Sequence, residues 1–124
     1  MAQRFDIVID SIVPSKLAKF WASALPGYAI RRYDEEEIAR LAAKGLTPET
    51  DPAVAIDGDG PTFWFQKVDQ PTQGRNRVHV DLCDADPATE VKRLQALGAK
   101  IRDEQDDHTV MLDPEGNQFC VGDW

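Results

Sequence analysis

The chain contains an internal repeat, in which residues 6–31 and 79–102 follow one template. At an offset of 73 residues, Pro14 aligns with Pro87, and a strand-like apolar alternation precedes each proline. A glycine follows the presumed helix of each copy. A sequence that repeats itself over such a length predicts a fold built from two similar modules, with chemistry placed where the two copies meet.

Module one reads as a strand, a helix and three further strands. Residues 4–12 alternate apolar and polar side chains, which is typical of a strand with one buried face. Pro14 suits the first position of a helix. The buried stripe predicted for this helix is Leu17, Phe20, Trp21, Ala24 and Leu25. Strands are predicted at 28–33, 53–57 and 62–68, with an inserted short helix capped by Asp34.

Module two repeats this order. Its first strand presents Val78, Val80 and Leu82 on one face, and Asp86 with Pro87 marks the start of its helix. The predicted buried stripe of the helix is Ala88, Val91, Leu94 and Leu97. Strands are predicted near 99–103, 107–112 and 117–122, with a tight turn at 113–117. The predicted fold class is therefore α+β, with two βαβββ modules.

Length and composition favour one domain. A chain of 124 residues with 42% hydrophobic content buries one core, and neither half is expected to be stable alone. We expect a single domain over 1–124, with module one at 1–70, a linker at 71–75 and module two at 76–124.

Net charge and cysteine spacing limit the classes of partner and the cellular location that we expect. A formal charge of -8 repels phosphate backbones and anionic lipid, so neither nucleic acid nor a membrane is an expected partner. No apolar run approaches the ~18 residues of a membrane span and no signal-peptide core is present, so a cytoplasmic location is expected. Cys83 and Cys120 lack CxxC spacing, which favours thiols over a disulfide framework.

Three stretches of the sequence resemble a known family. They are residues 14–21 at the start of the first helix, 76–82 at the start of module two, and 112–121 around the Asp-Pro-Glu-Gly-Asn turn. The chain resembles the vicinal oxygen chelate superfamily, which groups glyoxalases, bleomycin-resistance proteins and extradiol dioxygenases, and especially its glyoxalase-like domain branch. The resemblance implies a curved, incomplete barrel around a cavity, commonly completed in a homodimer.

The resemblance also implies a metal site at Asp6, Gln66, His79 and Cys120. The set departs from the family pattern of His or Gln, Glu, His and Glu. Strand parity independently places these residues on the sheet face away from the helices. A thiolate ligand favours zinc among divalent metals. The alternative is a degenerate site whose polar residues hydrogen-bond one another.

His79 is the predicted catalytic residue. It is either a metal ligand or a histidine hydrogen-bonded to Asp6 or Asp81, and beside a carboxylate it can act as a general base without metal. Cys120 has a second interpretation as a nucleophile activated by His79, although a small buried strand residue is the more ordinary role. Trp64 and Asp81 are predicted ligand-binding residues, with simple packing as the alternative for Trp64.

Two functions of different classes follow. In the first, the protein is a glyoxalase-type lyase or isomerase, in which a divalent metal or His79 alone stabilises an enolate-like intermediate of a small oxygenated substrate. In the second, the same cavity binds a small molecule or drug without chemistry, as resistance proteins of the superfamily do by sequestration. The missing glutamate ligands and the acidic charge favour binding or an altered metal site, and the retained histidine favours catalysis.

Overall fold

The chain folds into two compact units, Met1–Pro71 and Thr72–Trp124. The computed structural model describes residues 1–71, 73–74 and 76–124. The boundary between the units falls within the predicted linker 71–75, of which Thr72 and Arg75 lie outside the described residues. The units correspond to the two predicted modules, while their union into a single domain stays a prediction.

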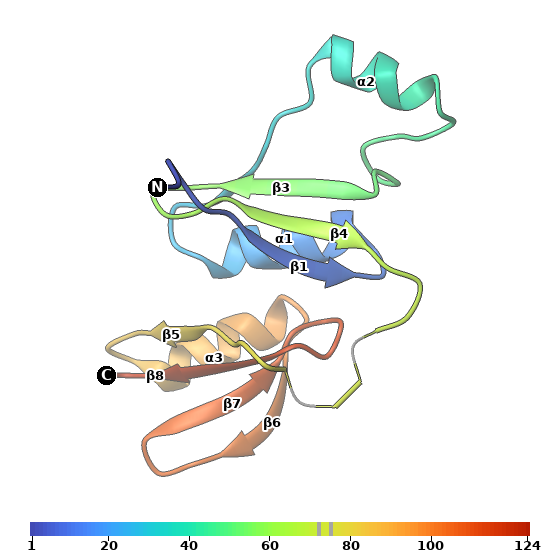
Figure 1. The fold of residues 1–124 in the computed structure, drawn as a ribbon. Helices are drawn as coiled ribbons and strands as arrows, with labels where there is room; N and C mark the ends of the chain where they lie inside the picture. Colours follow the sequence, from blue (N-terminus) through green and yellow to red (C-terminus); the bar gives the residue numbers. More distant parts are fainter. Residues whose placement is uncertain (72, 75) are drawn as a thin grey trace. The chain divides into compact units, whose positions relative to one another are not determined.

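Unit one is a four-stranded mixed sheet with one helix packed on it (Figure 1). Its sheet order is β1-β4-β3-β2, with β1 and β4 parallel and the other pairs antiparallel. Helix α1 contacts β3 and β4. The elements are β1 (Ile7–Ser11), α1 (Pro14–Ala24), β2 (Ala29–Ile30), α2 (Glu35–Ala42), β3 (Ala53–Asp57) and β4 (Phe63–Lys67).

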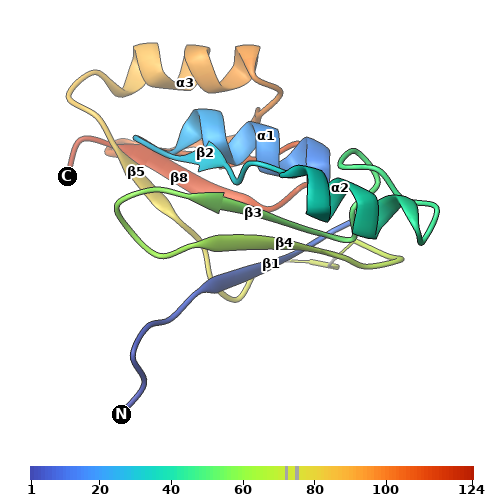
Figure 2. The same ribbon diagram turned by 90° about the horizontal axis from the view of Figure 1, so that it is seen from above.

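Unit two repeats this plan without the inserted helix. Its sheet order is β5-β8-β7-β6, again with one parallel pair, β5 and β8. Helix α3 contacts β8 and β6, and Figure 2 shows it over one side of β5 and β8. The elements are β5 (Asp81–Cys83), α3 (Pro87–Ala96), β6 (Lys100–Glu104), β7 (His108–Leu112) and β8 (Gln118–Gly122). Both sheets are open, and the predicted pair of βαβββ modules is confirmed.

Each core lies between a sheet and its helix. In unit one the predicted stripe of α1 is buried, and it meets the side chains of Phe63 and Phe65 on β4. In unit two the buried sheet residues include Met111, Phe119 and Val121. Side chains alternate across a strand, so the residues between these apolar ones are carried to the opposite face of each sheet.

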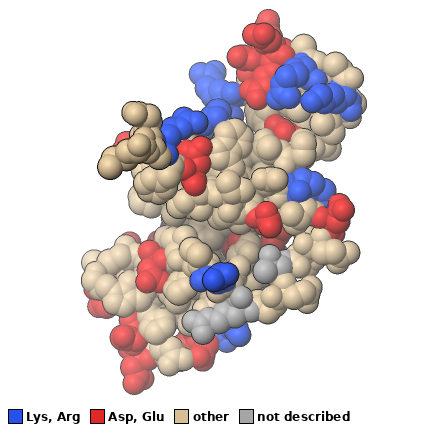
Figure 3. Space-filling model, in the orientation of Figure 1, with Lys and Arg blue, Asp and Glu red and all other residues tan. Residues whose placement is uncertain are grey.

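The inserted helix α2 starts as predicted. The Glu37 amide donates to Asp34 Oδ1 at 2.8 Å, which caps the helix, and acidic residues occupy its first turn. At the top of Figure 3 these acidic side chains lie beside Lys and Arg, and Arg40 lies 3.5 Å from Glu37. Because these opposite charges lie beside one another in solvent, the acidic run is a solvated helix start. No helix among the described residues has the length and apolar character needed to cross a membrane.

Two strands are shorter than predicted. Strand β2 covers only Ala29–Ile30, because the chain leaves the sheet after the Arg31 amide donates to the Ala55 carbonyl and then enters α2. Strand β5 begins at Asp81, so His79 precedes it, and Val78 is 81% exposed rather than part of an apolar face.

A side chain explains the late start of β5. The Cys120 amide donates to the Val80 carbonyl, so a continued parallel ladder would send the Gln118 amide to the carbonyl of Val78. That amide instead donates to Asn76 Oδ1 at 2.7 Å. Asn76 therefore replaces the backbone of β5 at this point, and Val78 is released from the sheet.

The buried stripe of α3 is narrower than predicted. Val91 and Leu94 are buried, but Ala88 and Leu97 are exposed. Leu97 is the C-cap, and the chain then turns so that the Ala99 amide donates to the Leu94 carbonyl. Ala99, buried just beyond the helix, takes the place expected for Leu97.

The turn between β7 and β8 is held by one buried carboxylate. Asp113 is 3% exposed, and its Oδ1 accepts from the amides of Glu115 and Asn117, both at 2.9 Å. Its Oδ2 accepts from Asn117 Nδ2 at 2.8 Å. The Asn76 amide in turn donates to Asn117 Oδ1 at 3.1 Å, so the turn is tied to the chain entering β5.

We expect Asp113→Ala to lower the free energy of unfolding by about 2–3 kcal/mol, because hydrogen bonds to a charged group are lost and buried donors lose their acceptor. Urea denaturation followed by circular dichroism measures this change. Glu104→Ala, at an exposed position of β6, is the matched control and should stay within about 0.5 kcal/mol of the parent. Equal effects of the two substitutions would contradict the role given to Asp113.

Candidate functional site

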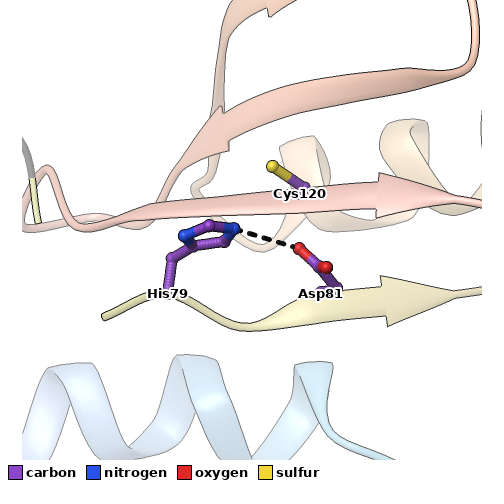
Figure 4. A group of neighbouring side chains, drawn as sticks. All are labelled: His79, Asp81 and Cys120. Atoms are coloured by element: carbon purple, nitrogen blue, oxygen red, sulfur yellow. Dashed lines mark ion pairs between the residues drawn. The ribbon is translucent and has the colours of Figure 1, made fainter. Parts of the chain in front are cut away.

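Three side chains capable of binding a metal meet on one face of the unit-two sheet. Asp81 opens β5 and lies opposite Cys120 of β8 in the parallel register, while His79 lies two residues before Asp81. Leu82 and Val121, which alternate with them, are buried on the helix side. Figure 4 shows His79, Asp81 and Cys120 projecting toward one another from these two segments.

The cluster combines a half-exposed ion pair with a buried sulfur. His79 Nε2 lies 3.2 Å from Asp81 Oδ1, with side chains 33% and 56% exposed. Cys120 is 6% exposed. One ligand atom from each of the three residues lies within 4.8 Å of the others. The site is thus open to solvent on the imidazole and carboxylate side and closed at the thiol.

This donor set fits a zinc-type ion. Nitrogen, carboxylate oxygen and thiolate are all zinc ligands, and bond lengths of about 2.0–2.3 Å place tetrahedral ligand atoms roughly 3.3–3.8 Å apart. The His79–Asp81 separation of 3.2 Å is close to that range, whereas the outer separation of 4.8 Å needs a small inward rotation of a side chain. Three protein ligands leave one tetrahedral position for a small molecule.

A pocket of about 260 Å³ lies on unit two and is lined by Arg102, Asp103, Val110 and Gln118. Val110 lies directly opposite Cys120 in the antiparallel β7–β8 register. Residues paired in this way share a face of the sheet, so the pocket and the cluster adjoin on the same face.

The corresponding face of unit one is built around Trp64. Its indole nitrogen donates to Asp6 Oδ2 at 3.2 Å, and the Arg31 guanidinium lies 5.0 Å from the centre of its ring. Arg31 is itself held by Asp57, through two hydrogen bonds of 2.8 Å. Trp64 is therefore fixed by charged neighbours at the ring edge and over the ring.

The ion pair between Arg31 and Asp57 shifts the pKa of both side chains. The hydrogen bonds from Arg31, together with one from Thr62, lower the pKa of Asp57 to about 2 despite some desolvation. The same carboxylate raises the pKa of Arg31. The pair therefore stays ionised through the whole neutral and mildly acidic range.

A family model described as glyoxalase-like domain matches residues 6–122. The chain belongs to the glyoxalase-like domain family. The fold and the family predicted from the three sequence stretches are confirmed by this match. A search of curated proteins found no match.

Solved structures of glyoxalase-like folds resemble this chain at low identity. The fosfomycin resistance protein FosX from Mesorhizobium loti is 10% identical, with 98% of this chain and 92% of that chain covered and a TM-score of 0.67. A glyoxalase/bleomycin resistance protein/dioxygenase family enzyme from Burkholderia phytofirmans is 15% identical, with 94% of each chain covered and a TM-score of 0.64. The trypanothione-dependent glyoxalase I of Leishmania major is 15% identical, with 99% and 87% covered and a TM-score of 0.61. These likenesses show the fold.

The predicted metal ligands of this glyoxalase-like domain are divided between the units. His79 and Cys120 come together in unit two, with Asp81 as their carboxylate neighbour. Asp6 and Gln66 belong to unit one, where Asp6 contacts Trp64 and Arg4, and Gln66 lies opposite Asp10. A shared site of Asp6, Gln66, His79 and Cys120 stays a prediction.

The register also shows which unit-one residue corresponds to Cys120. Cys120 pairs with Asp81, and the offset of 73 places Asp81 on Val8. Val8 pairs with Trp64, so Trp64 is the counterpart of Cys120, and Gln66 lies two pairs farther along the strand. The indole ring therefore occupies the place in unit one that the thiol occupies in unit two.

Two contributions were not anticipated from the sequence. Asp81 was predicted to bind ligand, and the structure adds that it is the third donor beside His79 and Cys120, which its spacing of two from His79 could have indicated. Asn76 was given no role, and a side chain that replaces a ladder carbonyl leaves no sequence pattern.

The Asp57–Arg31 pair should contribute stability that depends on pH. We expect Asp57→Asn to lower the free energy of unfolding by up to about 1 kcal/mol at neutral pH, a small value because both side chains are partly solvent-screened. A carboxyl whose folded-state pKa is depressed stabilises above its unfolded pKa, and this stability is lost as the pH falls through the folded value. The difference between parent and variant should therefore be constant above about pH 5 and vanish between the ordinary 3.8 and about 2.

Urea denaturation of both proteins at a series of pH values measures this difference. Asp59→Asn, in the exposed turn after β3, is the control and should show no such dependence. A gap between parent and Asp57→Asn that persists unchanged to pH 2 would contradict the depressed pKa.

Proposed function

We propose that this protein binds a small oxygen-bearing molecule beside His79, Asp81 and Cys120 and acts on it as a glyoxalase-type lyase or isomerase. The observation that carries the proposal is the convergence of three different donor atoms, within 4.8 Å of one another, next to a pocket of about 260 Å³. The pocket has polar and charged side chains around Val110, and pockets with a few convergent polar groups are usual sites of small-molecule binding.

His79 is the proton-transfer residue of the proposal. Asp81 Oδ1 lies 3.2 Å from its Nε2, a contact that orients the ring. The exposed edge of the imidazole faces solvent and can reach a bound molecule. The class of reaction it suits is removal and return of a proton on carbon next to a carbonyl group.

His79, Asp81 and Cys120 are the residues that would hold a divalent metal, with zinc favoured by the sulfur donor. When bound, such an ion supplies Lewis-acid stabilisation of negative charge on a substrate oxygen. The earlier ligand set adds Asp6 and Gln66 from unit one. The two sets share His79 and Cys120, so substitution of Asp6 distinguishes them.

A second function is binding without chemistry, as expected of a protein that sequesters a drug. It is favoured by the His79–Asp81 contact of 3.2 Å, which occupies a ring nitrogen and a carboxylate oxygen with each other. In that case the three side chains of the cluster bind the ligand through polar contacts and do not react with it. We also propose that the protein is a homodimer, which light scattering of the purified protein tests directly.

We expect the purified protein to bind about one zinc ion per chain. His79→Ala, Asp81→Asn and Cys120→Ser should each weaken zinc binding by more than about a hundredfold, since loss of even an outer-shell partner costs tenfold to a hundredfold. Competition with a chromophoric chelator measures the affinity, and cobalt substitution reports thiolate ligation by its absorption. His108→Ala is the matched control, because His108 also pairs with an aspartate, Asp107, at 2.7 Å.

The same titration separates the two ligand sets. Asp6→Ala should leave zinc affinity unchanged if His79, Asp81 and Cys120 hold the ion, and weaken it if Asp6 is a ligand. Zinc binding that survives Cys120→Ser and His79→Ala together would contradict both sets.

Proton exchange at carbon tests the chemistry. In deuterated water, first without metal and then with zinc, the protein should accelerate exchange of the C–H protons of hydroxyacetone, measured by proton nuclear magnetic resonance. In the metal-free protein, where the imidazole is not a zinc ligand, His79→Ala should lower this acceleration by about a hundredfold or more, the usual contribution of a general base. Binding of hydroxyacetone without any acceleration of exchange would reject the lyase or isomerase and favour the second function.

A further inference from the structure

The pocket beside the metal-binding cluster is lined by Arg102, whose charged neighbours differ from those of Arg31, its counterpart in the repeat. Arg102 lies on β6, and its Nη1 donates to Gln118 Oε1 at 2.6 Å. Among the described residues Arg102 forms no ion pair. In a chain of net charge -8, a guanidinium lining a pocket without a carboxylate bonded to it is available to an incoming anion.

The internal repeat explains why this charge is available. Arg31 and Arg102 hold matching positions, since Ile30-Arg31 aligns with Ile101-Arg102 at an offset of 71. Arg31 is neutralised by Asp57, which lies opposite Ala29, two residues before Arg31. The residue opposite Lys100, two residues before Arg102, is Leu112. The position of the neutralising carboxylate in unit one is thus apolar in unit two.

We infer that Arg102, with the side-chain amide of Gln118, binds the carboxylate of the small molecule that the cluster acts on; this rests on the proposed function. The Gln118 oxygen already accepts from Arg102, so its amide nitrogen is left to donate alongside the guanidinium. Both donors then face one anion, and Val110 supplies an apolar wall.

The pocket sets the charge and the length of this ligand. Asp103 also lines it and accepts from the Gln105 amide, so a second negative charge on the ligand would meet a carboxylate. A monoanion is therefore favoured over a dianion. Gln118 and Cys120 are two residues apart on one face of β8, a spacing of about 7 Å, which roughly five bonded carbon atoms span. The ligand class is a short monocarboxylic acid with an oxygen at its far end.

Binding of 5-oxohexanoate, its neutral amide 5-oxohexanamide and the dianion glutarate tests this inference by calorimetry. The parent should bind 5-oxohexanoate about tenfold or more tightly than the other two, since a charge-assisted hydrogen bond contributes at least that factor. Arg102→Gln should abolish the preference for the acid over the amide, and Arg102→Lys should retain part of it. Lys92→Gln, an exposed cation on α3, is the control and should change nothing.

An Arg102→Gln variant that keeps the parent's preference for the acid, or a parent that prefers the amide or glutarate, would overturn the inference. Zinc affinity is measured on the same samples to separate this result from the proposed function. Zinc bound normally with no acid preference in the parent overturns the carboxylate site alone. An Arg102-dependent acid preference in a protein that binds no zinc supports the carboxylate site and rejects the metal.

Discussion

The candidate site depends on the parallel pairing of β5 with β8. This pairing sets Asp81 opposite Cys120 and places His79 beside them, although His79 itself lies outside the strand. A slip of β5 by one residue would send His79 and Asp81 to the helix face and separate them from Cys120. The register is fixed at the turn before β8, where Asn76 accepts from the Gln118 amide and the buried Asp113 carboxylate holds the turn. The chemistry of the site therefore rests on two side chains that take no part in it.

The two units use one backbone plan for different purposes. In unit one the place that corresponds to the thiol is filled by Trp64, and the charges around it compensate one another, with Arg31 bound to Asp57. In unit two the corresponding face keeps a half-exposed imidazole, a buried thiol and an arginine opposite no carboxylate. The repeated βαβββ module supplies two equivalent sheet faces, and a few strand residues on each make one a fixed aromatic surface and the other a cluster of possible metal ligands.

The sequence predicted the structure correctly where interactions within a single turn determine it. Pro14 and Pro87 begin the two main helices and Asp34 caps the third, because missing donors and capping carboxylates act within a single turn. Alternation correctly paired His79 with Cys120 on one face. It failed at Val78 and Leu97, where an amide side chain ends a strand early and a C-cap turn brings Ala99 to the core. The contact that ends the strand joins residues 42 positions apart, which periodicity cannot detect, whereas the turn after Leu97 is a local backbone feature.

The competition between Asp81 and an added ligand for His79 decides which function this face performs. At 3.2 Å, the carboxylate and the imidazole satisfy each other, and this contact must be exchanged for bonds to a metal before both can serve as ligands. Cys120 supports that exchange in the proposed site, because its sulfur lies within 4.8 Å of donor atoms of His79 and Asp81 and a thiolate is a strong zinc ligand. Without the cation, the same contact leaves a half-exposed imidazole that is oriented by the carboxylate. In the proposed site, one proton or one metal ion would therefore occupy the same three residues, and the two occupants would support different chemistry.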